Sequence, residues 1–198
     1  MVQSSTAQRT LKMVQLAIFL ALVIVLQTLG SGIHIGPVSI SLTLIPIVLG
    51  GMMLGPVGGT VLGFAFGMVT LIAGITGTDA FTHILFTNHP VLTALVCLVK
   101  ATAAGLVSAL LFRALQSKHP RTAVFSAAAA APIVNTGLFI LGALFMSDTL
   151  RANFIPDGTS VIYFLVIGCA GINFIVEFFL NAVLSPALFR VLCVIRKK

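Results

Sequence analysis

The chain has 198 residues, of which 59% are hydrophobic and 8% are charged, and its mean hydropathy is +1.17. Soluble domains carry about 25% charged residues, so the composition excludes a soluble globular protein and predicts an integral membrane protein. The formal net charge of +7 does not indicate a nucleic-acid surface, because the Lys and Arg residues stand beside the apolar segments, where membrane proteins carry them.

Six apolar segments are predicted to be transmembrane helices, since a spanning helix needs about 20 apolar residues and satisfies its own backbone hydrogen bonds. The whole chain, 1–198, is then one all-α membrane domain, a bundle of six transmembrane helices. The predicted helices cover residues 11–30, 40–54, 56–76, 90–116, 122–147 and 160–193. The first segment is expected to be retained, because no convincing small-residue cleavage site follows it.

The basic residues predict the orientation of this bundle. An even number of helices places both termini on one side, and that side receives nine of the eleven Lys and Arg residues. By the positive-inside rule, both termini are predicted to be cytoplasmic. The opposite side has only Arg151, and its three loops, at about 31–39, 77–89 and 148–159, are rich in polar residues and are expected to face outward.

Small residues recur every fourth position at two places. Gly55, Gly59, Gly63 and Gly67 begin the third predicted helix, and this spacing lets another helix approach closely. We expect these glycines to pack inside the bundle. Ala17 and Ala21 repeat the same spacing on the first predicted helix.

Two charged residues lie within apolar segments, Lys100 in the fourth predicted helix and Glu177 in the sixth. A charge at bilayer depth costs at least about 2.5–3.5 kcal/mol on insertion scales, so such residues are expected to face the bundle interior. Two interpretations remain open. The residues form a structural ion pair, or they line a cavity that is open to the outer leaflet.

Amide side chains accompany these charges. The stretch "GINFIVEFFLNAVL" at 171–184 places Asn173, Glu177 and Asn181 on one helix face, because they stand four residues apart. Asn181 is expected to lie deepest and to pack between helices. Convergence of polar groups from the last three predicted helices indicates a pocket for a small polar molecule. The predicted substrate-binding residues are Asn88, His89, Lys100, Asn135, Asn173 and Glu177.

No pattern of residues indicates catalysis, a cofactor or a metal. A usable Ser/His/Asp arrangement is missing, and His34, His83, His89 and His119 do not have the spacing of metal ligands. The sequence contains no phosphate-binding G-x-x-x-x-G-K-[ST] motif, so ATP would have to be used by a partner. An enzyme is therefore disfavoured, whereas a stand-alone proton-coupled carrier or channel that uses Glu177 remains an alternative.

The stretch "LIPIVLGGMMLGPVGGTVLGFAFG" at 44–67 joins a short Pro-containing helix to a glycine-rich helix. With six predicted helices in under 200 residues, the chain resembles the substrate-binding S components of energy-coupling factor (ECF) vitamin transporters. The resemblance implies a non-enzymatic protein of the prokaryotic plasma membrane that captures a vitamin from outside, under a lid formed by the 31–39 and 77–89 loops. It also implies delivery to one membrane coupling protein and two ATPases, and docking through the motif Ala17-x-x-x-Ala21.

Two segments are similar to the pantothenate-specific branch of that family. They are "NTGLFILGALFM" at 135–146, and Asn173 and Glu177 followed by "NAVLSPAL". Phe174 and Val176 differ from the Gly and Pro that are usual at these positions. On the two similar segments, the resemblance implies pantothenate as the substrate. Because of the two differences, folate, riboflavin or a similar vitamin is the alternative.

Overall fold

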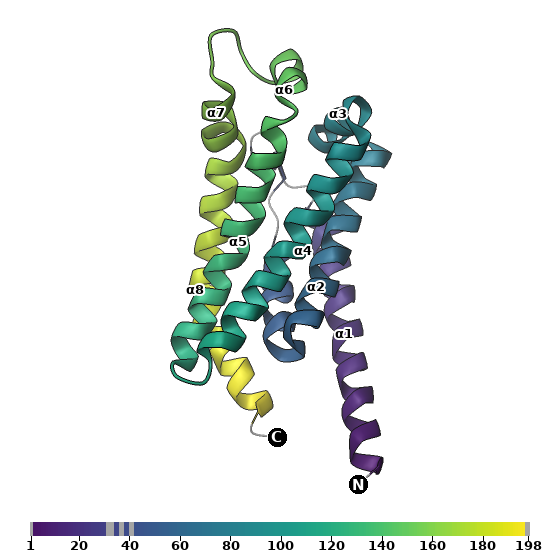
Figure 1. Cartoon of the computed structure of the whole chain (residues 1–198), viewed down its shortest axis with the longest axis vertical. Coiled ribbons are helices and arrows are strands. Elements are labelled where there is room, and N and C mark those ends of the chain that lie inside the picture. The colour runs from purple at the N-terminus through teal and green to yellow at the C-terminus, as the bar shows by residue number, and fades with distance from the viewer. Residues whose placement is uncertain (1, 31–33, 36–37, 40–41, 197–198) are drawn as a thin grey trace.

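The computed structural model describes residues 2–30, 34–35, 38–39 and 42–196, and almost all of them are helical (Figure 1). The helices are α1 (Val2–Gly30), α2 (Leu44–Thr76), α3 (Ala80–Asn88), α4 (Pro90–Leu115), α5 (Pro120–Leu144), α6 (Ser147–Asn153), α7 (Val161–Tyr163), the π-helical segment η1 (Phe164–Gly171) and α8 (Ile172–Arg196). Strands β1 (His34–Ile35) and β2 (Val38–Ser39) form one short antiparallel pair. The prediction of an all-helical fold is confirmed for the described residues apart from this short pair, while most of the predicted 31–39 loop lies outside them.

Five helical segments in the described chain are long and apolar enough to cross a membrane, compared with the six predicted. They are Ala7–Gly30, Leu44–Thr76, Pro90–Leu115, Pro120–Leu144 and Val161–Arg190. The difference lies in the predicted helices 40–54 and 56–76, which together correspond to α2. The part of α2 before Gly55 is only about 16 Å long at about 1.5 Å per residue, about half of a hydrocarbon core of about 30 Å.

The break that the sequence predicts between these two helices is present at Gly55. This residue has φ 82° and ψ −172°, which is not helical and favours glycine, and Pro56 then starts the second arm with a preset φ. The two arms pack against each other, since a Cβ on Gly51 would lie 3.4 Å from the Cα of Gly59. α2 is therefore a helical hairpin, with a short first arm and a long second arm.

The glycines of the second arm pack against α4. A methyl group at Gly63 would overlap the carbonyl oxygen of Ala101, and one at Gly67 would lie 2.6 Å from the carbonyl oxygen of Cys97. Gly59 meets the α4 backbone one turn further along. The prediction that the glycines pack inside the bundle is confirmed for Gly59, Gly63 and Gly67, because their missing side chains allow the two backbones to touch. It is wrong for Gly55, which forms the break and has nothing within 4 Å of a Cβ.

A single methyl group tests this packing. Gly63→Ala is expected to lower the free energy of unfolding by about 1–3 kcal/mol, because the added carbon has no room against α4. The measurement is the thermal unfolding midpoint of the purified protein in detergent. Gly137→Ala is the control, since nothing lies within 4 Å of a Cβ at Gly137, and this change should leave the midpoint unchanged or raise it. Equal midpoints for the two variants would contradict the close approach.

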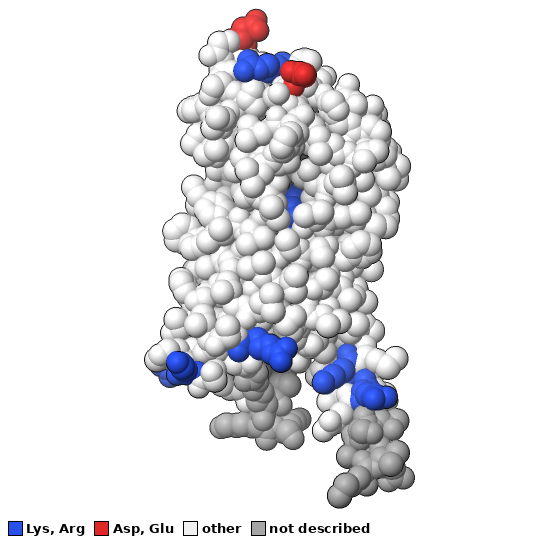
Figure 2. All heavy atoms as spheres, viewed as in Figure 1, with Lys and Arg blue, Asp and Glu red and all other residues white. Residues whose placement is uncertain are grey.

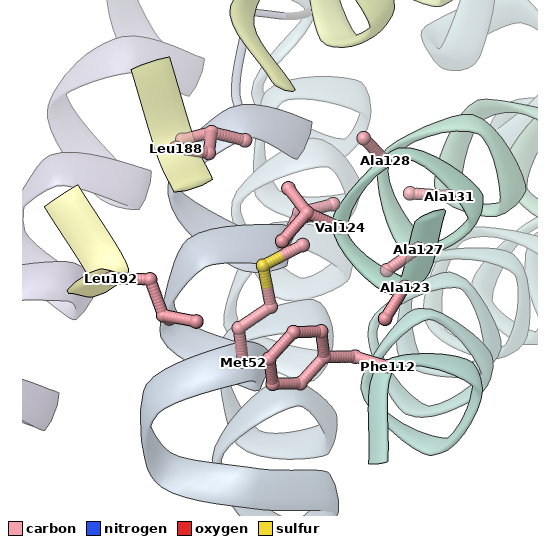
Figure 3. Close-up of a cluster of buried hydrophobic side chains, with 10 residues drawn as sticks. Met52, Phe112, Ala123, Val124, Ala127, Ala128, Ala131, Leu188 and Leu192 are labelled. Atoms are coloured by element: carbon pink, nitrogen blue, oxygen red, sulfur yellow. The ribbon is translucent and has the colours of Figure 1, made fainter. Parts of the chain in front are cut away.

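Figure 3 shows a cluster of buried hydrophobic side chains, which we call the lower core. Met52 of α2, Phe112 of α4, Val124 of α5, and Leu188 and Leu192 of α8 converge there, and all five are buried. Apart from Val124, the α5 side of this cluster is made of alanines, Ala123, Ala127, Ala128 and Ala131. Small side chains bring α5 close to its neighbours.

Two segments that were predicted as loops are helices. The 77–89 loop contains α3, and the 148–159 loop begins within α6. Phe81 and Leu85 stand one turn apart on α3 and are both 3% exposed, so their burial stabilises a helix in a segment that is polar overall. They belong to a second cluster, the upper core, made of Phe81, Leu85, Phe139, Ala143, Met146, Leu150, Val161, Leu165 and Cys169.

Charge separates the two ends of the bundle. Both termini and the α4–α5 connection lie at one end, and α3 and α6 lie at the other (Figure 1). Figure 2 shows that basic side chains gather at the end with the termini, which we call the basic end, while the acidic side chains in view lie at the opposite end. This distribution follows the sequence pattern, in which Arg113, Lys118 and Arg121 flank the α4–α5 connection.

Candidate functional site

A cavity of about 60 Å³ lies inside the bundle, and each long helix contributes to its wall. The lining residues are Gln27, Phe66, Thr70, Asp79, Phe81, Thr82, Lys100, Asn135, Thr136, Phe139, Cys169, Ala170, Asn173 and Glu177. Phe81, Phe139 and Cys169 are also members of the upper core, which closes the cavity toward α3 and α6. The cavity therefore lies between the upper and lower cores.

Four of the six predicted substrate-binding residues line this cavity. Lys100 comes from α4, Asn135 from α5, and Asn173 and Glu177 from α8. Asn135, Asn173 and Glu177 are 6%, 6% and 5% exposed. The structure thus brings the polar groups of three helices to one place, as the sequence pattern indicated. Their contact with a substrate remains a prediction.

Lys100 is held against an aromatic ring. Its Nζ lies 5.0 Å from the centroid of the Phe139 ring, a distance at which a cation is attracted to the ring face. Lys100 and Glu177 line the same cavity, but the pairing of the two charges remains a prediction. The aromatic contact keeps the ammonium group at the cavity wall, where it can meet an anionic group of a ligand.

Asn88 and His89, the other two predicted substrate-binding residues, do not line the cavity, and their contact with a substrate remains a prediction. Asn88 is exposed, and its Nδ2 donates to the backbone oxygen of Ile84, 2.8 Å away, within α3. His89 is half-buried between α3 and α4, and its backbone N–H donates to the oxygen of Leu85 at 2.8 Å. The reason is the helical fold of α3, which uses these two residues to end one helix and begin the next.

The polar face of α8 serves two purposes. Asn173 and Glu177 line the cavity, whereas Asn181 does not and is 1% exposed. The Nδ2 of Asn181 donates to the backbone oxygen of Glu177 at 2.8 Å. Asn181 therefore lies nearer the basic end and bonds within its own helix, as a buried packing residue and not as part of the cavity wall.

Several polar residues that line the cavity were not among the predicted site residues. Gln27 of α1 donates from Nε2 to the hydroxyl of Thr70 at 3.3 Å, and its Oε1 accepts from Thr43 at 2.9 Å. A single amide near the end of an apolar segment was the signal that could have identified it. Asp79 and Thr82 gave no such signal, because they follow the second arm of α2 in a polar segment, and only the fold of α3 brings them inward.

The lining can bind a small polar molecule. It provides one ammonium group, two carboxyl groups, three amides, several threonine hydroxyls and three phenylalanine rings. Such a mixture offers donors, acceptors and apolar contact, as small-molecule sites do. Among the described residues, no group of three or more His, Cys, Asp and Glu side chains could hold a metal ion.

Residues 11–189 match the family described as ECF transporter, substrate-specific component. The chain belongs to this family. A comparison with curated proteins gave no match. The family consists of transporter components and not of enzymes, so the chain is a substrate-specific component of a transporter, and its apolar helices indicate a multi-pass membrane protein.

In this S component, the predicted docking residues lie on the outside. Ala17 and Ala21 are both exposed on α1, while Phe19 and Val23 of the same helix are buried against α2. Exposed small residues one turn apart leave a shallow, flat strip on which another membrane helix can lie closely. The strip is therefore available to a partner, and its use for docking remains a prediction.

Proposed function

We propose that this S component captures pantothenate from outside the cell and delivers it to a module of one membrane coupling protein and two ATPases. The observation that carries this proposal is the meeting of Lys100, Asn135, Asn173 and Glu177 in one cavity. Pantothenate has a carboxylate, two hydroxyls and an amide. A cation, amides and a carboxyl group are the side chains that can bind these groups.

We further propose six passes through the membrane with both termini in the cytoplasm. The basic end supports this orientation, since cytoplasmic segments carry an excess of Lys and Arg. The first arm of α2 would lie in the cytoplasmic half of the second pass. In this orientation the lower core seals the cavity from the cytoplasm, and the upper core with α3 covers it from outside.

The size of the cavity implies movement during capture. Sites for small molecules measure about 300–1,000 Å³, whereas this cavity has about 60 Å³. The elements of the upper core must therefore separate before pantothenate enters. α3 is the element that we propose moves, because Phe81 and Thr82 of this short helix reach the cavity directly. This agrees with the role of a lid that the family resemblance implies for the 77–89 segment.

Identification of the bound molecule tests the substrate. Mass spectrometry of the purified protein is expected to find pantothenate, and isothermal titration of ligand-free protein is expected to give heat with pantothenate but not with riboflavin or folate. The lack of Trp in the chain makes calorimetry preferable to intrinsic fluorescence. Binding of riboflavin or folate without binding of pantothenate would refute the proposed substrate.

A further inference from the structure

Asp79 is a buried carboxylate with one unused oxygen. It is 6% exposed and stands in the turn between α2 and α3, at the wall of the cavity. Its Oδ2 accepts a hydrogen bond from the hydroxyl of Thr82 at 2.7 Å. Its Oδ1 is fully enclosed and has no hydrogen-bond partner among the residues that the structure describes.

Asn135 presents a second acceptor of this kind from another helix. It lies on α5, is 6% exposed and lines the same cavity, and its Oδ1 also has no hydrogen-bond partner within the described part of the chain. Two enclosed oxygens without donors therefore belong to the wall of one small cavity. In folded proteins most buried polar atoms are hydrogen-bonded, and each exception calls for an explanation.

The internal contact of Asp79 does not explain this arrangement. The bond from Thr82 occupies one carboxylate oxygen and helps to hold the start of α3, but an asparagine side chain could accept it equally well. A carboxyl group in a low-dielectric site strongly favours a donor on each oxygen. The donor for Oδ1 can come from a molecule that enters the cavity.

We infer that Asp79 and Asn135 accept hydrogen bonds from hydroxyl or N–H groups of the transported molecule, so that Asp79 determines ligand specificity. This inference rests on the proposed function. The lining has two acidic residues, Asp79 and Glu177, and one basic residue, Lys100. A ligand that is only an anion therefore fits poorly. A ligand with hydroxyl or N–H donors besides any anionic group satisfies both the ammonium group and the unused oxygens.

Replacement of Asp79 tests this inference. Asp79→Asn is expected to weaken pantothenate binding about 10- to 100-fold in isothermal titration, because hydrogen bonds to a charged acceptor are the strong ones. The unchanged protein should bind an analogue of pantothenate that lacks the bonded hydroxyl more weakly than pantothenate, by the same factor. With the Asp79→Asn protein, the analogue and pantothenate should bind almost equally, since the interaction is already lost.

Two further variants separate ligand contact from a structural role. Asp157→Asn makes the same chemical change at an exposed carboxylate outside the cavity, and it should leave the affinity unchanged. Thr82→Val removes the bond to Oδ2 and leaves Oδ1 in place. It should therefore weaken binding less than Asp79→Asn does. Asn in place of Asp79 can still accept from Thr82, so an equal loss in these two cavity variants would show no separate role for Oδ1 and would overturn the inference.

The same titrations test separately whether pantothenate is the substrate and whether Asp79 contacts the ligand. Heat with riboflavin or folate instead of pantothenate refutes the proposed substrate. The inference about Asp79 is then supported if Asp79→Asn weakens binding of that vitamin at least tenfold, and it is refuted if the affinity for that vitamin is unchanged. Unchanged pantothenate affinity in the Asp79→Asn protein overturns the inference while the proposed function stands.

Discussion

Lys100→Met is expected to weaken pantothenate binding about 100-fold in isothermal titration. Lys100 is the basic side chain of the cavity lining, and its Nζ is held 5.0 Å from the centroid of Phe139. Removing one member of an enclosed, hydrogen-bonded charge pair costs about 2–5 kcal/mol, and every 1.4 kcal/mol corresponds to about tenfold. Met keeps the length and apolar body of the side chain, so the loss reports the charge.

Lys118→Met is the matched control for this variant, since Lys118 is exposed near the α4–α5 connection and lies outside the cavity lining. Its affinity should equal that of the unchanged protein. Thermal unfolding midpoints of both variants show whether the cavity variant is folded. A Lys100→Met protein that is folded and binds pantothenate normally would contradict the role of the ammonium group.

The double variant Lys100→Met with Glu177→Gln decides whether the two intramembrane charges contact the ligand or form only a structural ion pair. If both side chains contact the ligand, Glu177→Gln alone should weaken binding about tenfold, and the double variant should bind at least as weakly as Lys100→Met. If the charges form only a structural pair, removing both together relieves the uncompensated charge, and the double variant should regain affinity. Recovery of affinity would therefore refute ligand contact by Lys100.

Ala17→Leu and Ala21→Leu are expected to reduce vitamin uptake below about one tenth while leaving pantothenate affinity within about twofold. Both alanines are exposed on α1. A leucine there has room in the isolated S component but would hold back a helix that must approach closely. Uptake is measured in liposomes that contain the S component together with its coupling protein and ATPases, and affinity is measured by titration of the same purified variants.

Ala187→Leu is the matched control. Ala187 is also exposed but lies on α8, which is on the opposite side of the bundle from α1 (Figure 1). This variant should transport normally. Equal loss of uptake in Ala187→Leu would show that any added bulk impairs transport, and loss of binding in the α1 variants would show that Ala17 and Ala21 pack the bundle.

Liposomes that contain the S component alone complete this comparison. The proposed function requires that they take up no pantothenate, with or without a pH gradient, because ATP is used by the partner subunits. Flux that responds to a pH gradient would instead favour a stand-alone carrier in which Glu177 binds the proton.

The helical segments were predictable because lipid imposes a simple rule on the chain. A backbone in hydrocarbon must satisfy its own hydrogen bonds, so long apolar segments become helices, and basic residues mark their ends. Both α4 and α5 lie within three residues of their predicted bounds. The break at Gly55-Pro56 was equally readable, since this pair of residues disfavours a straight helix. The length of the first arm of α2 could not be predicted from the sequence, because it depends on where the chain packs inside the bundle.

The cavity was predictable only in part. Polar groups inside apolar segments stand out against their surroundings, and this contrast identified Lys100, Asn135, Asn173 and Glu177 correctly as lining residues. Asn88 and His89 do not line the cavity, and their contact with a substrate remains a prediction. These residues lie in a polar segment, where a polar residue does not stand out from its neighbours. Their position is decided by the fold of α3 and not by the local sequence.

The sequence alone thus determined the membrane class, the approximate helices and the polar groups within them, because hydrophobicity and helical period act locally along the chain. Only the tertiary structure decided which polar groups of the loops join the cavity. α3 forms because Phe81 and Leu85 are buried against residues distant in sequence, and that packing carries Asp79 and Thr82 inward. Burial of this kind depends on contacts between separate helices, which no local pattern contains.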